Sequence, residues 1–117
     1  MMHLGKSVAL MVTFLVALGT MSPAEAFLGK CLLAVDGKTY VKGICRIDRT
    51  VGGSFSIGTG MRTRAKYFAY VSVEPSGQAQ GYWNGVEAES HAHDSLGVLM
   101  RQGACWVNER AKICGFR

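Results

Sequence analysis

Residues with the chemistry of metal ligands and acid–base catalysts gather between Glu87 and Asp94, in the run Glu-Ala-Glu-Ser-His-Ala-His-Asp. Because side chains alternate along a strand, an extended backbone puts both glutamates and both histidines on one face. Imidazole and carboxylate groups arranged in this way suit Zn²⁺, Ni²⁺ or Cu²⁺. The candidate metal site comprises Glu87, Glu89, His91 and His93, with Asp94 as a further ligand.

The same run has a second interpretation, as a polar strand edge that leads into a loop. Ser90 is able to cap a turn through Asp94, and such a turn would scatter the side chains of the candidate site. Acid–base catalysis by Glu87 or Glu89 with His93 is a third interpretation, but nothing in the spacing demands it. Since the chain also lacks a Gly-x-Ser-x-Gly elbow and a P-loop, we expect a protein that is not an enzyme.

A basic connector, Arg62-Thr63-Arg64-Ala65-Lys66, presents its cations on one face if it is extended. Anionic lipid, lipopolysaccharide or an acidic protein surface suits these cations, whereas nucleic acid is not expected as a partner of an exported chain. Aromatic residues follow the connector and form a candidate recognition patch. The alternative is a solvated basic edge, with the aromatic residues in the core. The predicted partner-binding residues are Arg62, Arg64, Lys66, Tyr82 and Trp83, with Tyr67 and Tyr70 in the same patch.

Charge is unevenly distributed along the chain. The net charge is +6 over residues 27–66, −4 over residues 67–100 and +3 over residues 101–117, within a formal total of +5. Such separation is typical of a molecule with one basic and one acidic face. The alternative is that charged turns and edges are simply solvated, and that positive edges block aggregation between sheets.

The elements that must position these residues are short strands, organised around the stretch Lys66–Glu89. Tyr67–Val73 alternates with a period of two and is rich in aromatic and β-branched residues, which predicts a strand. A Pro-Ser-Gly turn leads back into a second strand, Gln78–Trp83. Asn84-Gly85 is a strong two-residue hairpin signal and predicts that a third strand follows it.

Strand and turn signals recur along the rest of the chain about every 8–12 residues. The further predicted strands are Cys31–Val35, Lys38–Cys45, Ser54–Ile57, Leu96–Arg101, Ala104–Asn108 and Lys112–Phe116. This spacing predicts an all-β fold, a small antiparallel sandwich or barrel of about 7–8 short strands. The predicted core comprises Leu32, Tyr40, Phe55, Ile57, Phe68, Tyr70, Val71, Trp83, Leu99, Trp106, Ile113 and Phe116.

Residues 1–26 have the features of a secretory signal peptide. A weakly basic start precedes the uncharged apolar run Ser7–Gly19, and Ala24-Glu25-Ala26 matches the small-x-small pattern that signal peptidase recognises. Because a spanning helix needs about 20 apolar residues, retention of the run as a membrane anchor is the weaker interpretation. We expect cleavage before Phe27 and a periplasmic or secreted single β-domain over residues 27–117, without a stable membrane span.

The expected mature domain contains all four cysteines, and an even count in an exported chain predicts two disulfides. Cys31 and Cys45 flank an Asp-Gly turn, which favours their pairing. A turn at residues 108–111 places Cys105 opposite Cys114, within disulfide reach. A zinc site formed by the four thiolates is the rival interpretation, but the chain has no Cys-x₂-Cys pair.

In format, the chain is similar to periplasmic lysozyme inhibitors, which are small exported β-domains with few cysteines. Those proteins carry a Ser-Gly-x-x-Tyr motif, whereas Ser76-Gly77 here is followed by Gln78-Ala79-Gln80-Gly81 before Tyr82. The motif is not matched, so the resemblance is one of format. We therefore expect an exported, disulfide-stabilised binding protein that is inhibitor-like or adaptor-like. Transition-metal binding by Glu87–His93 and a small enzyme are the alternatives, and no cofactor other than such a metal is expected.

Overall fold

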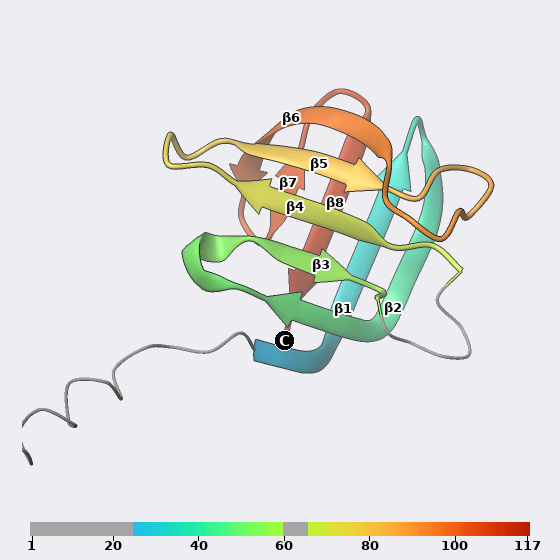
Figure 1. The fold of residues 1–117 in the computed structure, drawn as a ribbon, viewed down its shortest axis with the longest axis horizontal. Coiled ribbons are helices and arrows are strands. Elements are labelled where there is room, and N and C mark those ends of the chain that lie inside the picture. The colour runs from blue at the N-terminus through green and yellow to red at the C-terminus, as the bar shows by residue number, and fades with distance from the viewer. Residues whose placement is uncertain (1–24, 60–65) are drawn as a thin grey trace, which may run out of the picture.

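A computed structural model describes residues 25–59 and 66–117. The strands are β1 (Glu25–Val35), β2 (Lys38–Arg49), β3 (Phe55–Ile57), β4 (Ala69–Val73), β5 (Ala79–Trp83), β6 (Asp94–Gln102), β7 (Cys105–Val107) and β8 (Ala111–Phe116), with a short 3₁₀ turn η2 (Val51–Gly53). Each strand pairs antiparallel with the next, and β8 pairs with β1 to close a barrel (Figure 1). This confirms the all-β prediction and selects the barrel over the sandwich.

The hairpin of β1 and β2 is longer than predicted. Its turn residues, Asp36 and Gly37, have φ angles of 51° and 83°, the left-handed conformation that the Asp-Gly signal predicts. From this turn the pairing continues to the start of β1 at Glu25. Glu25 and Ala26, which the sequence assigns to the signal peptide, are therefore strand residues here. Residues 1–24, with the rest of the predicted signal peptide, lie outside the described residues.

The central meander follows the prediction for two strands and departs from it at the third. β4 and β5 pair across the predicted turn, where the Gly77 amide donates to the Glu74 carbonyl at 2.9 Å. After Asn84, however, residues 85–88 form a turn, and pairing with β5 resumes only in β6. The third strand predicted directly after Asn84-Gly85 is therefore wrong. The cause is Asn84, whose side chain is buried inside the loop instead of lying at the tip of a hairpin.

Most of the predicted core residues lie in the barrel interior. Those that are buried are Phe55, Ile57, Val71, Trp83, Leu99, Trp106 and Ile113. Tyr70 and Phe116 are exposed, and the remaining three predicted core residues, Leu32, Tyr40 and Phe68, are only partly buried. Side chains alternate between the two faces of a strand, so only one residue of an apolar pair such as Leu32 and Leu33 points inward. Leu33 is that residue, with no exposed surface.

Glycines on the inward face show how closely the interior is packed. A β-carbon at Gly29 would lie 2.6 Å from the Phe116 carbonyl oxygen, and one at Gly81 would lie 2.6 Å from Leu99 Cδ1. At Gly115 the nearest atom would be Ile57 Cγ2, at 3.1 Å. Because the described barrel is filled by its own side chains, sites for partners and ligands must be sought on its outer faces and at its two ends.

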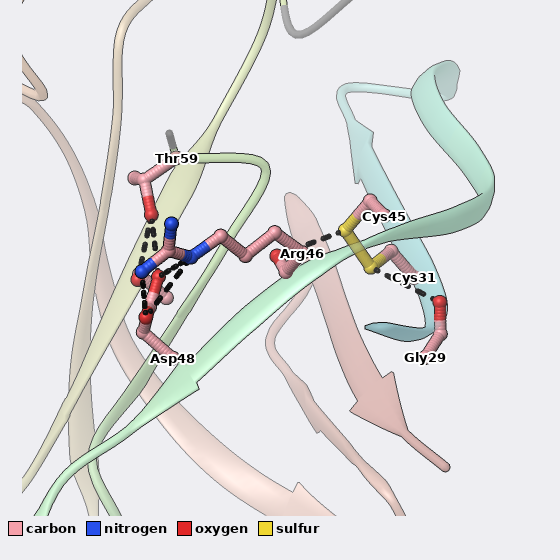
Figure 2. The surroundings of a disulfide bond; sticks show 7 residues. Gly29, Cys31, Cys45, Arg46, Asp48 and Thr59 are labelled. Atoms are coloured by element: carbon pink, nitrogen blue, oxygen red, sulfur yellow. Dashed lines mark hydrogen bonds and ion pairs between the residues drawn. A yellow bond between two sulfur atoms is a disulfide. The ribbon is translucent and has the colours of Figure 1, made fainter. Parts of the chain in front are cut away.

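Two disulfides link neighbouring strands, and both predicted pairings are confirmed. Cys31 and Cys45 join β1 to β2 with their Cα atoms 5.9 Å apart (Figure 2). Cys105 and Cys114 lie directly opposite each other on β7 and β8, with their Cα atoms 4.1 Å apart. Since no cysteine is free, the rival zinc site of four thiolates is wrong. Two disulfides fit a protein of an oxidising compartment.

The described residues include no helix that has the length and apolar character needed to cross a bilayer.

Candidate functional site

The acidic and histidine residues predicted to bind metal do gather, although not as an extended strand. They line one hollow of about 260 Å³ in the loop between β5 and β6, namely Glu87, Glu89, His91, His93 and Asp94. The two imidazole rings lie 5.3 Å apart between centroids. A turn over residues 85–88 and bends at Ser90 and His91 replace the extended backbone that the prediction required, so the shared strand face is wrong.

Metal-ligand geometry is incomplete in this hollow. Among the described residues, no group of three His, Cys, Asp or Glu side chains is placed so that it could hold a metal ion. The hollow therefore provides two neighbouring imidazoles and a carboxylate-rich wall.

Asn84 organises this loop, although the sequence predicts that it lies in an exposed hairpin turn. Its side chain is 1% exposed. The amide nitrogen donates to the carbonyl oxygens of Lys66 and Glu89 at 2.9 and 3.0 Å, while its oxygen accepts from the Phe68 amide at 3.0 Å. These bonds join the segment before β4 to the loop after β5. Nothing in the local sequence distinguishes Asn84 from a hairpin-turn residue, because its partners lie in the segment before β4 and in the β5–β6 loop.

The structure describes three of the predicted partner-binding residues, Lys66, Tyr82 and Trp83, and one of them, Trp83, is buried. Arg62 and Arg64 lie outside the described residues. Lys66 is exposed, with Nζ 5.6 Å from the centre of the Tyr67 ring. Tyr82 faces outward on β5 directly opposite Tyr70, which is 39% exposed, and these two form the outward part of the predicted aromatic patch.

Trp83 belongs to the core and not to the predicted patch. Trp83 is 4% exposed. The centroid of its ring lies 4.7 Å from the ring centroid of Tyr40 and 6.2 Å from that of Tyr67. The tryptophan thus anchors an aromatic cluster beneath the β5–β6 loop. Because its ring is covered by its neighbours, Trp83 contributes almost no exposed surface to the predicted patch.

A different surface carries the exposed apolar side chains. Leu28 on β1 and Ile44 on β2 are each 66% exposed, and Phe116 on β8 is 38% exposed. The register brings them together, because Lys30 pairs with Ile44 on one side and with Phe116 on the other. An open groove of about 460 Å³ lies on the outer surface of β2, β1, β8 and β7, and its exposed lining is almost entirely apolar. We call this surface the lysine-flanked face; it comprises Leu28, Lys30, Leu32, Lys42, Ile44, Cys105, Lys112, Cys114 and Phe116.

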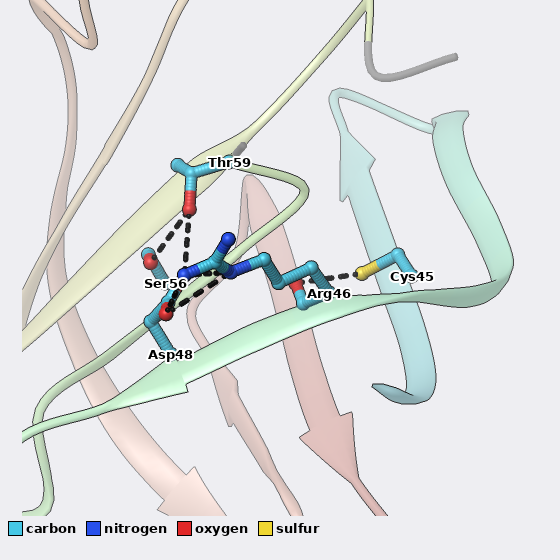
Figure 3. Close-up of polar contacts among 5 residues, drawn as sticks. All are labelled: Cys45, Arg46, Asp48, Ser56 and Thr59. Carbon is cyan, nitrogen blue, oxygen red and sulfur yellow. Dashed lines mark hydrogen bonds and ion pairs between the residues drawn. The ribbon is translucent and has the colours of Figure 1, made fainter. Parts of the chain in front are cut away.

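The lysines on this face lack acidic partners among the described residues, whereas Arg46 beside the face has one. Arg46 donates to both carboxylate oxygens of Asp48 at 3.0 to 3.2 Å, and Thr59 donates to the same carboxylate at 3.0 Å (Figure 3). Ser56 lies 3.2 Å from the Thr59 hydroxyl and extends this network. The three lysines, in contrast, form no ion pair with any acidic group in the part of the chain that the structure describes. The face is therefore an apolar groove with an uncompensated positive border.

The sequence does not predict this face, because Leu32 and Phe116 are expected in the core and strand patterns do not reveal that β1 pairs with β8. The signal was available in β1, where the outward positions alternate as Leu28, Lys30 and Leu32.

No protein-family model, no curated protein and no solved structure matches this chain.

Proposed function

We propose that the chain is an exported, non-enzymatic binding protein that docks an envelope or extracellular protein on the lysine-flanked face. The observation that carries this proposal is the group of exposed apolar side chains on adjoining strands, above all Leu28 and Ile44. Contiguous exposed apolar surface marks interaction sites on proteins. A closed barrel with two disulfides is rigid, so little conformational entropy is lost on binding, which favours an inhibitor-like or adaptor-like role.

The charges on the face indicate the chemistry of the partner. Lys30, Lys42 and Lys112 border the groove, and all three are exposed. A complementary surface has an apolar centre bordered by Asp or Glu side chains. Such border charges mainly accelerate association and reject partners of the wrong charge. We therefore infer an acidic protein surface with an apolar centre as the occupant of the groove.

The periplasm or the cell exterior is the proposed location. The disulfides support an oxidising compartment, and the composition of residues 1–26 supports export through a cleaved signal peptide.

Affinity capture from an envelope extract tests the docking proposal, using the disulfide-bonded protein and a matched pair of variants. Ile44→Asp places a charge in the groove, whereas Val51→Asp changes an exposed apolar residue on η2, outside the face. We expect Ile44→Asp to weaken capture at least about tenfold, because an unpaired charge would be buried at the interface. Val51→Asp should capture the partner as well as the parent protein does. About 0.5 M NaCl should slow the association of the partner with the parent and with Val51→Asp.

A partner captured equally by both variants, or the absence of any such partner, contradicts the proposal. Vesicles of anionic phospholipid form a second arm of the experiment. If the parent protein sediments with these vesicles and Ile44→Asp does not, the face binds a membrane surface and the inferred protein partner is wrong.

A second candidate function is transition-metal binding in the hollow of the β5–β6 loop. The observation that favours it is the pair of imidazoles, whose ring centroids lie 5.3 Å apart within a carboxylate-lined hollow. His91 and His93 would supply the first two ligands, and Glu87, Glu89 or Asp94 a further one, for Zn²⁺, Ni²⁺ or Cu²⁺.

Calorimetric titration with each of the three metal ions tests this second function. We expect saturable uptake that weakens in acid, because imidazole must be neutral to ligate a metal. The double variant His91→Ala/His93→Ala should lose this uptake. If the parent and the double variant take up metal equally, or if neither does, the hollow is not a metal site.

A further inference from the structure

A hollow of about 410 Å³ lies at the end of the barrel away from the histidine-containing loop. Turns alternate between the two ends of an antiparallel barrel, so the β2–β3, β4–β5 and β6–β7 turns share this end with the carboxyl end of β8. All four of these segments contribute to its lining. The side chains that matter for its chemistry are Arg49, Phe55, Arg101, Trp106 and Phe116.

Two guanidinium groups border the hollow. Nε of Arg101 donates to the Gly103 carbonyl at 3.1 Å, and the Arg49 guanidinium lies 5.1 Å from the centre of the Phe27 ring. Neither group forms an ion pair with an acidic residue in the described ranges. Among the described residues, no Asp or Glu lines the hollow, although Glu74 lies in the adjacent β4–β5 turn. Arginine provides planar donors that match carboxylates, phosphates and sulfonates, so the rim favours an anion.

Aromatic rings form the apolar part of the lining. Phe55 and Trp106 point into the barrel and are each 7% exposed, which leaves a small part of each residue open to solvent. The rim beside them is open because it is built from glycines at 52, 53, 77 and 103, with φ angles between 65° and 95°. Glycine adopts such angles readily, while other residues do so with strain. An apolar floor with a few convergent polar groups at its rim is typical of a small-molecule site.

We infer that this hollow binds a small organic anion that combines an acidic group with a planar apolar ring. The acidic group, a phosphate, sulfonate or carboxylate, lies between Arg49 and Arg101. The ring lies over Phe55 and Trp106. This site is separate from the lysine-flanked face except at Phe116, which borders both, so the experiment leaves Phe116 unchanged.

Titration of the disulfide-bonded protein with phenyl phosphate tests the inference, with amide NMR signals of Gly52, Gly53, Gly77 and Gly103 as the readout. Inorganic phosphate supplies the anion alone, and benzyl alcohol supplies the ring alone. We expect saturable shifts with phenyl phosphate, at an affinity at least about tenfold higher than with either partial ligand, because the ring and anion contacts act together. Equal affinity for inorganic phosphate and phenyl phosphate would overturn the assignment of the ring.

Variants locate the binding. Arg49→Gln and Arg101→Gln should each weaken phenyl phosphate binding about tenfold, as expected for loss of a charge-assisted hydrogen bond. Arg110→Gln is the matched control, since this arginine pairs with Asp36 at the other end of the barrel. Ala104→Trp, at an exposed position of the lining, fills the hollow without changing charge and should abolish binding.

Binding that persists unchanged in both arginine variants and in Ala104→Trp overturns the inference. The same titration on Ile44→Asp separates this site from the docking proposal. We expect Ile44→Asp to bind phenyl phosphate as the parent does. If Ile44→Asp loses binding while Arg101→Gln retains it, the ligand binds on the lysine-flanked face and the inference is wrong.

Discussion

At the scale of single residues, Asn84 shows the largest difference between its sequence signal and its role. Asn-Gly predicts an exposed hairpin turn, yet Asn84 is buried and bonds to three backbone groups. Local propensity could not reveal this, because its partners at Lys66, Phe68 and Glu89 are set by the packing of the segment before β4. The side chain substitutes for the strand pairing that this loop lacks.

Asn84→Ala should lower the free energy of unfolding by about 3 kcal/mol, because it leaves the Phe68 amide and two carbonyl oxygens without partners. Urea denaturation measures this change. Gln102→Ala, which removes an exposed amide on β6, is the control and should change stability by less than about 0.5 kcal/mol. Equal stability of both variants would show that the Asn84 bonds are replaced by water.

The Asp36–Arg110 pair joins the β1–β2 turn to the β7–β8 turn. Arg110 donates to both carboxylate oxygens of Asp36 at 3.1 Å, and the Asp36 amide donates to the Arg110 carbonyl at 2.8 Å. The pKa of Asp36 is lowered from its ordinary value of 3.8, chiefly by the hydrogen bonds from Arg110, which outweigh the opposing effect of desolvation, and to a smaller extent by the Arg110 charge. A lowered pKa in the folded state means that the pair stabilises the fold above pH 3.8. That contribution is lost as the pH falls through the folded-state pKa.

Arg110→Gln should therefore raise the pKa of Asp36 toward its ordinary value. Carbon NMR of the Asp36 carboxyl group during an acid titration of both proteins measures this change. Because the pair is exposed, we expect the difference to shrink at high salt. A titration curve for Asp36 that is the same in parent and variant would show that the guanidinium does not hold the carboxylate in solution.

At the scale of elements, the sequence predicted pairings between neighbouring strands well. The Asp36-Gly37 turn, the β4–β5 turn and the opposition of Cys105 to Cys114 all followed from turn chemistry and a period of two. The prediction that Leu32, Tyr70 and Phe116 point into the core is wrong, because these side chains lie on the outward face of their strands. These strands carry apolar residues on both faces, and apolar character alone does not distinguish a core from an exposed binding surface.

Removal of either disulfide should destabilise the barrel to a similar extent. The bridges span 14 residues in Cys31–Cys45 and 9 in Cys105–Cys114. Loop-closure entropy predicts that each contributes about 3 kcal/mol, slightly more for the longer loop. Urea denaturation of the double variants Cys31→Ala/Cys45→Ala and Cys105→Ala/Cys114→Ala checks this. A loss below about 1 kcal/mol for either pair would mean that the unfolded chain is already restricted by other contacts.

At the scale of the whole molecule, barrel closure brings together residues that the sequence keeps far apart. Lys30 pairs with Phe116, and the hollow with the two arginines is formed by three turns and the end of β8. The alternation of net charge along the chain did not identify these surfaces, because β1 and β8 become neighbours only when the sheet closes. The surfaces proposed as binding sites are formed by closure and could not be predicted from the sequence, whereas the fold class and the disulfides could.

The predicted cleavage before Phe27 would remove the first two residues of β1. In the described structure Glu25 begins β1, and its carboxylate accepts a hydrogen bond from Arg117 at 2.6 Å. Cleavage before Phe27 removes this ion pair but leaves Phe27, whose ring centre lies 4.1 Å from the Arg117 guanidinium. Since exposed ion pairs contribute at most about 1 kcal/mol, the barrel should remain folded after cleavage.

Intact-mass spectrometry of the protein recovered from the periplasm of a bacterial host, after expression of the full chain, measures this processing. We expect a mass for residues 27–117 that lacks one hydrogen per cysteine, since both disulfides form after export. Replacing Ala26 with a bulky residue should block cleavage, because signal peptidase requires a small side chain there. A full-length reduced chain in the cytoplasm would contradict both the export and the compartment that the docking proposal requires.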